Sequence, residues 1–223
     1  MDIAIGIVGH NKRGDQAAEL MHTVGAAYRS VDNGTRGCDH NHRRVWDRLS
    51  RYDTTWSICL EDDAVPANGF TDQLEQALTH SPCDVVSLYL GTSRPVWYQT
   101  RGDRAARKLQ PLIAEAIEKA DAEGASFITA PKLFHGVAVA IRTPLVPSML
   151  DYVSASKKPI DYAISDWCET EGHTIAYSCP SICDHRDEPS VITRHPDGQP
   201  RNKPRVAHRY GARDTWNSKA VTL

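Results

Sequence analysis

Short apolar runs alternate with amphipathic segments along the first part of the chain. The run 3–8 is mostly apolar and precedes a glycine, and the segment 15–24 has apolar residues at helical spacing. A strand-like run at 26–31, a helical pattern at 42–49 and a strand-like run at 56–60 follow. This order predicts an α/β sheet with helices on its faces.

The same alternation continues further along the chain. A helical pattern at 70–78 precedes a strand-like run at 84–90. After an interruption, a strand-like run at 137–141 is followed by helical segments at 145–152 and 161–171. The later part of the chain is therefore expected to extend the same sheet.

The range 91–130 interrupts this rhythm. It begins with a basic stretch and continues with apolar residues at helical spacing between Leu109 and Ala120. Its basic residues are Arg94, Arg101, Arg104, Arg107 and Lys108. We expect an insertion over the sheet edge, either a lid or an ordinary packed helix with a solvated charged face. Trp97 and Tyr98 are candidates to stack on a sugar ring or to pack in the core.

The composition changes after residue 185, and this change divides the chain. We expect a main domain over 1–185 and a basic, proline-rich arm over 186–223, either wrapped on the domain or partly disordered. The arm has eight basic residues against four acidic ones, a net charge of +4. Such an arm could clamp a diphosphate or contact a polyanionic partner.

Overall composition excludes several classes of protein. The 223 residues carry 26 basic and 28 acidic side chains, a net charge of −2. This balance argues against a protein that binds a polyanion with its whole surface. No apolar stretch approaches the roughly 20 residues of a membrane span, and no secretory signal is visible at the start. With only six cysteines we expect a cytoplasmic protein with free thiols at Cys59, Cys83 and Cys168.

Three consecutive acidic residues, Glu61, Asp62 and Asp63, follow the strand-like run 56–60. Strand alternation places Glu61 and Asp63 on one side and Asp62 on the other. Carboxylates this close repel one another, and a divalent cation would relieve the repulsion and bind substrate phosphates. Open α/β sheets bind ligands at the carboxyl ends of their strands. The triplet therefore indicates a metal–phosphate site, with a solvated acidic turn or a helix start as the alternative.

Two groups of cysteine and histidine raise the question of zinc. They are Cys38, His40 and His42, and Cys179, Cys183 and His185. Neither group has the paired-cysteine spacing typical of structural zinc. Zinc is therefore the less favoured interpretation.

An ordered series of motifs runs from residue 37 to residue 192. It comprises Gly37-Cys38-Asp39-His40-Asn41-His42 with Trp46 and Leu49, Leu60-Glu61-Asp62-Asp63-Ala64 with Phe70, His135-Gly136-Val137-Ala138, Pro159-Ile160-Asp161, Pro180-Ser181-Ile182 with His185, and Ser190-Val191-Ile192. The series resembles glycosyltransferase family 25, which includes the lipooligosaccharide and collagen galactosyltransferases. The chain departs from the family at Asn41, where the family usually has serine.

The resemblance implies a fold and an activity. The fold is of the GT-A type, with a mixed, mostly parallel central sheet flanked by helices. The activity is metal-dependent transfer of a hexose from a nucleotide-diphosphate donor, a UDP-sugar, to an acceptor hydroxyl with inversion. The cofactor is Mn²⁺ or Mg²⁺. Asp63 is the expected direct ligand, with Glu61 and Asp62 in support.

Other site residues follow from the same resemblance. His185 is a candidate metal or diphosphate contact, with a surface loop histidine as the alternative. Asp161 and Asp166 are candidates for the base that deprotonates the acceptor, since we expect Asp166 on a face similar to that of Asp161. Asp161 could instead act as the N-cap of the following helix.

Four residues after the first two strands are candidates for binding the donor nucleotide. His10, Asn11 and Arg13 follow the first strand, and Asp32 follows the second, where an acid can accept a hydrogen bond from a ribose or a base. Ordinary loop polarity is the simpler account of all four.

The resemblance leaves the partner open. A protein, a glycan and a modified DNA base all remain candidate acceptors, and the oligomeric state is open. Short enzymes of this kind also occur in phages of actinobacteria, which would place the chain in the host cytoplasm. The alternatives to transfer are a nucleic-acid-binding protein that uses the arm and the arginine-rich insertion, and a metal-dependent nuclease or phosphatase.

Overall fold

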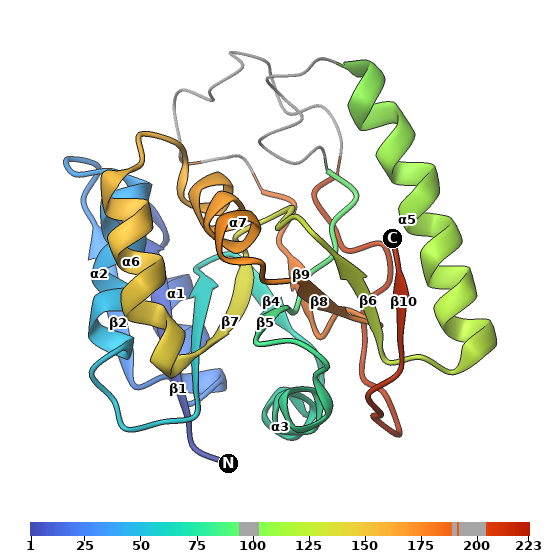
Figure 1. The fold of residues 1–223 in the computed structure, drawn as a ribbon. Helices are drawn as coiled ribbons and strands as arrows, with labels where there is room; N and C mark the ends of the chain where they lie inside the picture. The colour runs from blue at the N-terminus through green and yellow to red at the C-terminus, as the bar shows by residue number, and fades with distance from the viewer. Residues whose placement is uncertain (94–102, 189–190, 192–203) are drawn as a thin grey trace.

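The computed structural model describes residues 1–93, 103–188, 191 and 204–223 (Figure 1). Its strands are β1 (Ile3–His10), β2 (Tyr28–Asp32), β3 (Trp56–Glu61), β4 (Ala64–Pro66), β5 (Val85–Ser87), β6 (Phe127–Ala130), β7 (Ala138–Arg142), β8 (Ile175–Ser178), β9 (Cys183–His185) and β10 (Ala220–Thr222). Its α-helices are α1 (Gly14–Thr23), α2 (Cys38–Leu49), α3 (Phe70–His80), α5 (Asp103–Glu123), α6 (Val146–Ala155) and α7 (Ile160–Glu171). Two 3₁₀ turns, η1 (Asn11–Arg13) and η2 (Thr143–Leu145), precede α1 and α6.

Within the described residues the strands form one eight-stranded sheet and one two-stranded sheet. The large sheet has the order β10-β6-β8-β5-β7-β3-β1-β2, and the small one pairs β4 with β9. β1 runs parallel to β2 and β3, β5 parallel to β8, and β10 parallel to β6. β7 is antiparallel to β3 and β5, and β6 is antiparallel to β8. The predicted α/β class, with a large mixed sheet flanked by helices, is confirmed.

Helices cover both faces of the large sheet. Along β1, Ala4 and Val8 belong to the apolar cluster beneath α2, α5, α6 and α7, and Ile5 and Ile7 belong to the cluster beneath α1 and α3. This alternation follows from the two-residue period of a strand. At Gly6 a Cβ atom would lie 2.6 Å from Cγ1 of Val45, so the glycine permits the close approach of α2 to β1.

The last twenty described residues pack against the domain. β10 pairs with β6, a strand of the central sheet that lies inside the range predicted as an insertion. Trp216 is buried, and the Arg213 guanidinium donates to the backbone oxygens of Ala125 and Cys179. Residues 204–223 are therefore wrapped on the domain.

Some expectations concern residues outside the described ranges. These are the basic and aromatic side chains of the predicted insertion and arm, and part of the family-like motif at 190–192. They are Arg94, Trp97, Tyr98, Arg101, Ser190, Ile192, Arg194, Arg201 and Lys203, together with the side chains of Arg104, Arg107 and Lys108. In the part of the chain that is described, no helix is long and apolar enough to cross a membrane.

The topology brings several polar segments to one edge of the sheet. Because β1, β2 and β3 are parallel, their carboxyl ends lie together, followed by η1, the loop after Asp32 and the acidic triplet. The β4–β9 pairing sets Ala64 opposite His185. A residue late in the chain is thereby placed beside the end of β3.

Candidate metal centre

Glu61, Asp63 and His185 form a group at the carboxyl end of β3. One ligand atom from each lies within 4.8 Å of the others. The ligand atoms of Glu61 and Asp63 lie close together as predicted, although Asp63 lies in the turn after β3 and not in the strand. The β4–β9 pairing supplies His185. The structure therefore brings together three of the four residues predicted as metal ligands.

Asp63 is the most enclosed carboxylate of the group. Its side chain is 8% exposed, and its Oδ2 lies 3.3 Å from His185 Nε2 and accepts a hydrogen bond from Arg13 Nη1. Burial acts to raise the pKa of Asp63, but the contacts with His185 and Arg13 outweigh it and lower that pKa. Burial acts to lower the pKa of His185, and the contact with Asp63 raises it overall. Each partner therefore favours the charged form of the other, and a metal ion at His185 would take the place of the proton on its ring.

Two atoms of this pair face inward without a described partner. Asp63 Oδ1 and His185 Nδ1 are both buried, and no hydrogen-bonding group among residues 1–93, 103–188, 191 and 204–223 reaches them. Buried polar atoms are usually satisfied. The orphaned carboxylate oxygen is an observation that favours a ligand at this group.

Asp62, the fourth predicted ligand, lies outside this group and shares the partner Arg13 with Asp63. Its Oδ2 accepts the backbone N–H of His10 at 2.7 Å, and its Oδ1 accepts from Arg13 Nη1 at 3.2 Å. Burial and the nearby charge of Asp63 raise the pKa of Asp62 to about 6, although the bond from His10 opposes the shift. Asp62 therefore fixes the turn after β1.

Arg13 is buried against the acidic triplet. Its side chain is 7% exposed, donates to both Asp62 and Asp63, and lies 4.0 Å from Glu188. The repulsion between the two aspartates, from which the sequence predicts a metal ion, is thus relieved in part by a guanidinium. Arg13, predicted to contact the donor, links Asp62 and Asp63 instead.

Glu61 lies between His42 and Asp161. His42 Nε2 lies 3.1 Å from Glu61 Oε1. A Cβ atom at Gly136 would lie 3.4 Å from Asp161 Cβ and 3.6 Å from Glu61 Oε1, so both acids flank this glycine. Burial and the charge of Glu61 raise the pKa of Asp161 to about 7. Asp161 is thus a carboxyl group beside the candidate centre whose pKa lies near neutral pH.

The position of Asp161 in α7 tests one of its two predicted roles, that of helix N-cap. The N-cap position of α7 is Pro159, and Asp39 Oδ1 accepts the N–H of Ile160 at 2.9 Å. Asp161 is the second helical residue, so the N-cap interpretation is wrong: the cap comes from α2. A proton-accepting role for Asp161 stays a prediction.

Asp166 does not share the face of Asp161. Both lie in one continuous helix, where five residues turn a side chain by about 140°. Asp166 forms an ion pair with Lys158. The expectation of a similar face is wrong, because a shared face needs a separation of three or four residues.

The other predicted donor contacts lie along the edge of the sheet. His10 and Asp32 are register partners at the ends of β1 and β2, and Asn11 is exposed in η1. The Asp32 carboxylate accepts the backbone N–H groups of residues 34, 36 and 37, and these bonds lower its pKa against slight desolvation. Asp32 therefore closes its own loop, while His10 and Asn11 remain beside the triplet.

Tyr89, which sequence reasoning missed, borders His185. The Tyr89 ring lies 6.2 Å from the His185 ring and 5.2 Å from that of His135. His135 Nε2 lies 3.1 Å from Ser93 Oγ, and burial lowers the pKa of His135 to about 3. Tyr89 has no distinctive local pattern, because its proximity to His185 arises only from the tertiary fold. His135 belongs to the motif series that resembles the family, but the sequence predicted no role for it.

The lowered pKa of His135 predicts a loss of stability in acid. Between about pH 6.5 and pH 3 the unfolded chain binds a proton that the folded chain rejects, so the free energy of unfolding falls by up to about 1.4 kcal/mol per pH unit. His135→Gln removes this titration and should show a shallower acid slope in urea unfolding. His22→Gln, at an exposed position of α1, should keep the wild-type slope, and equal slopes for all three proteins would contradict the prediction.

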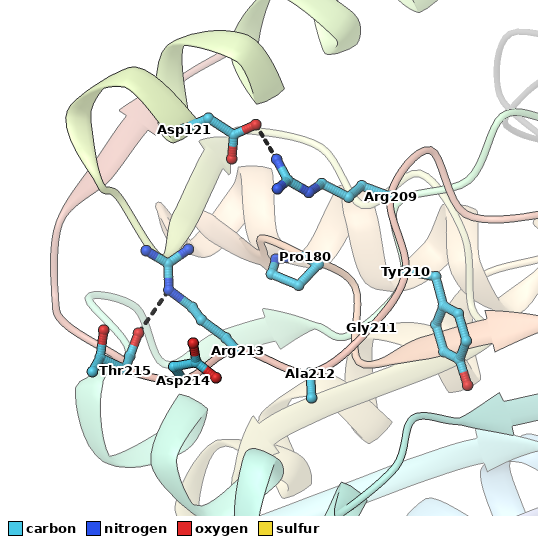
Figure 2. Close-up of a pocket in the computed structure, with 9 residues that line it drawn as sticks. All are labelled: Asp121, Pro180, Arg209, Tyr210, Gly211, Ala212, Arg213, Asp214 and Thr215. Carbon is cyan, nitrogen blue, oxygen red and sulfur yellow. Dashed lines mark hydrogen bonds and ion pairs between the residues drawn. The ribbon is translucent and has the colours of Figure 1, made fainter.

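A separate polar cavity lies beside the C-terminal segment (Figure 2). It has a volume of about 500 Å³ and is lined by Pro180, Arg209 and Arg213 among others. Arg209 pairs with Asp121, and the Arg213 guanidinium donates to backbone oxygens, including that of Thr215 at 2.7 Å. Both cations are engaged in holding the segment, so the cavity offers no ready anion site.

Comparisons with known proteins leave the function to be argued from the site. No protein-family model matches the sequence, and the search of curated proteins finds no match. Among solved structures, the chain is similar to A197 from STIV at 14% identity, with a TM-score of 0.44. That alignment covers 96% of this chain and 97% of the other.

Proposed function

We propose that the chain is a metal-dependent glycosyltransferase of the GT-A type. It moves a hexose from a nucleotide-diphosphate donor, a UDP-sugar, to an acceptor hydroxyl with inversion. The observation that carries the proposal is the group of Glu61, Asp63 and His185 at the carboxyl ends of parallel strands. The motif series that resembles glycosyltransferase family 25 contains all three residues.

The donor atoms of this group fit Mn²⁺ or Mg²⁺. Two carboxylates and one imidazole are ligands that Mn²⁺ accepts, and carboxylates suit Mg²⁺. Asp63 Oδ1, which is buried and has no hydrogen-bond partner among the described residues, gives the group an oxygen that a cation could bind. When bound, the ion would neutralise charge that develops on the departing nucleoside diphosphate.

The protein side chains around the group have separate tasks. Asp161, whose pKa of about 7 suits a base near neutral pH, would take the proton of the acceptor hydroxyl. Arg13 keeps Asp62 and Asp63 side by side, and Asp62 holds the turn after β1 through the His10 N–H. His10 and Asn11 would then border the nucleotide of the donor.

Donor turnover with and without metal tests the proposal. We expect UDP-hexoses with Mn²⁺ to raise the melting temperature more than either component alone, since ligands of the folded state stabilise it. Donor hydrolysis or transfer should disappear with EDTA and in Asp63→Asn. Asp47→Asn, an exposed acid paired with Arg51, is the matched control and should behave as wild type.

Three outcomes would contradict the proposal. One is the absence of any thermal shift with nucleotides, nucleotide-sugars and Mn²⁺ together. The second is equal turnover with Mn²⁺, with EDTA and in Asp63→Asn. The third is release of phosphate from nucleic acid without any sugar donor, which would favour a metal-dependent nuclease or phosphatase.

A further inference from the structure

A second group of ligand-type side chains lies on the other side of Glu61. Cys38 and His42 are four residues apart in α2 and therefore share a helix face. Cys59 and Glu61 are two residues apart in β3 and therefore share a strand face. Cys59 packs in the apolar cluster that contains Val45 of α2, so the two faces meet.

The contacts within this group centre on the His42 ring. One ligand atom each from Cys38, His42 and Glu61 lies within 4.8 Å of the others. The ring nitrogen Nε2 lies 3.1 Å from Glu61 Oε1, and Nδ1 lies 3.7 Å from Cys59 Sγ. The imidazole is thus held from both sides between a carboxylate and a thiol.

The group combines buried side chains with others that solvent can reach. His42 is 2% exposed and Cys59 is 1% exposed. Cys38 is an exposed residue at the first turn of α2, and the Glu61 side chain is 27% exposed. An ion could therefore arrive from solvent at Cys38 and Glu61 and meet the buried imidazole behind them.

We infer that Cys38, His42 and Glu61 bind a zinc ion. A thiolate, an imidazole and a carboxylate are the ligand types that zinc takes, and three protein ligands leave a fourth position for water. Zn–S and Zn–N bonds in a tetrahedron place their ligand atoms about 3.5 Å apart, so the present spacing needs only small side-chain rotations. Cys59 contacts the ring nitrogen beside it and fixes the ring orientation, as supporting groups around zinc do.

The thiol distinguishes this centre from the one at Asp63. Thiolate ligands favour zinc, whereas the carboxylates and imidazole of Glu61, Asp63 and His185 suit Mn²⁺ or Mg²⁺. Zinc binding displaces the thiol proton of Cys38 to solvent. The two groups share Glu61, so an ion at one withdraws a ligand from the other.

Cobalt(II) absorption tests the zinc site without any nucleotide or turnover. Metal-free, reduced protein titrated with Co²⁺ should show the near-ultraviolet band of a thiolate bound to cobalt, and Zn²⁺ should remove it. Cys38→Ser should abolish the band, and His42→Gln should weaken Co²⁺ binding by at least about tenfold. Cys83→Ser, at a half-buried cysteine outside the group, should retain the band.

The variants separate this inference from the proposed function. Asp63→Asn should keep the thiolate band, because Asp63 belongs only to the other group. Thermal melts of Cys38→Ser, whose residue is exposed, verify that a lost band does not reflect unfolding. Absence of the band in the wild-type chain, or its persistence in folded Cys38→Ser, would overturn the zinc site whatever the chain transfers.

Discussion

Arg13→Met is expected to lower the free energy of unfolding by about 3–5 kcal/mol. Arg13 is 7% exposed and donates to two carboxylates that are themselves buried. Methionine fills much of the same volume but leaves Asp62 and Asp63 side by side without the guanidinium. A buried charge that loses its partner costs far more than an exposed pair contributes. Urea unfolding near neutral pH, without added metal, measures the difference.

Arg51→Met provides the matched control. Arg51 pairs with Asp47 across one helical turn, with side chains 65% and 55% exposed. Its removal should change the free energy of unfolding by less than about 1 kcal/mol. Equal stabilities of the Arg13 and Arg51 variants would mean that the buried contact does not hold the acidic triplet together.

Local patterns predicted much of the fold because the spacing of apolar residues follows the period of the strand or helix that buries them. The apolar run 3–8 became β1, and the run 56–60 became β3, with the acidic triplet at its end. The sequence predicted Glu61 and Asp63 on one side, and the structure brings their ligand atoms together, although the turn after β3 and not the strand period positions Asp63. The helical pattern at 161–171 lies in α7, within one residue of its start. Cys59, Cys83 and Cys168 are free as predicted, and the other three cysteines are free as well.

Contacts between distant segments could not be predicted in the same way. His185 reaches Asp63 only because β9 pairs with β4, and Arg13 reaches the triplet only because η1 follows β1, which pairs with β3. β10 is three residues long, and a pattern that short does not predict a strand. Its pairing with β6 forms one edge of the sheet. The hydrogen bond by which Asp39 of α2 caps α7 could likewise not be predicted from a local pattern.

Asp161→Asn is expected to lower turnover by about 10²- to 10⁴-fold, the usual contribution of a positioned general base. Asparagine has the same shape but cannot take the proton of the acceptor hydroxyl. The amide also removes a half-buried acid whose pKa is raised by desolvation and by Glu61, so the folded chain should lose no stability near neutral pH. Initial rates of transfer, with UDP–Mn²⁺ binding measured in parallel, test the expectation that binding survives while turnover fails.

Asp166→Asn is the control that makes this result specific. Asp166 lies in the same helix, pairs with Lys158 and points away from Asp161, so its neutralisation removes one partly exposed ion pair. Its turnover should stay near wild type. Wild-type turnover in Asp161→Asn with UDP–Mn²⁺ binding intact would exclude Asp161 as the base. A large loss in Asp166→Asn alone would place the acceptor on the opposite side of α7, away from Glu61.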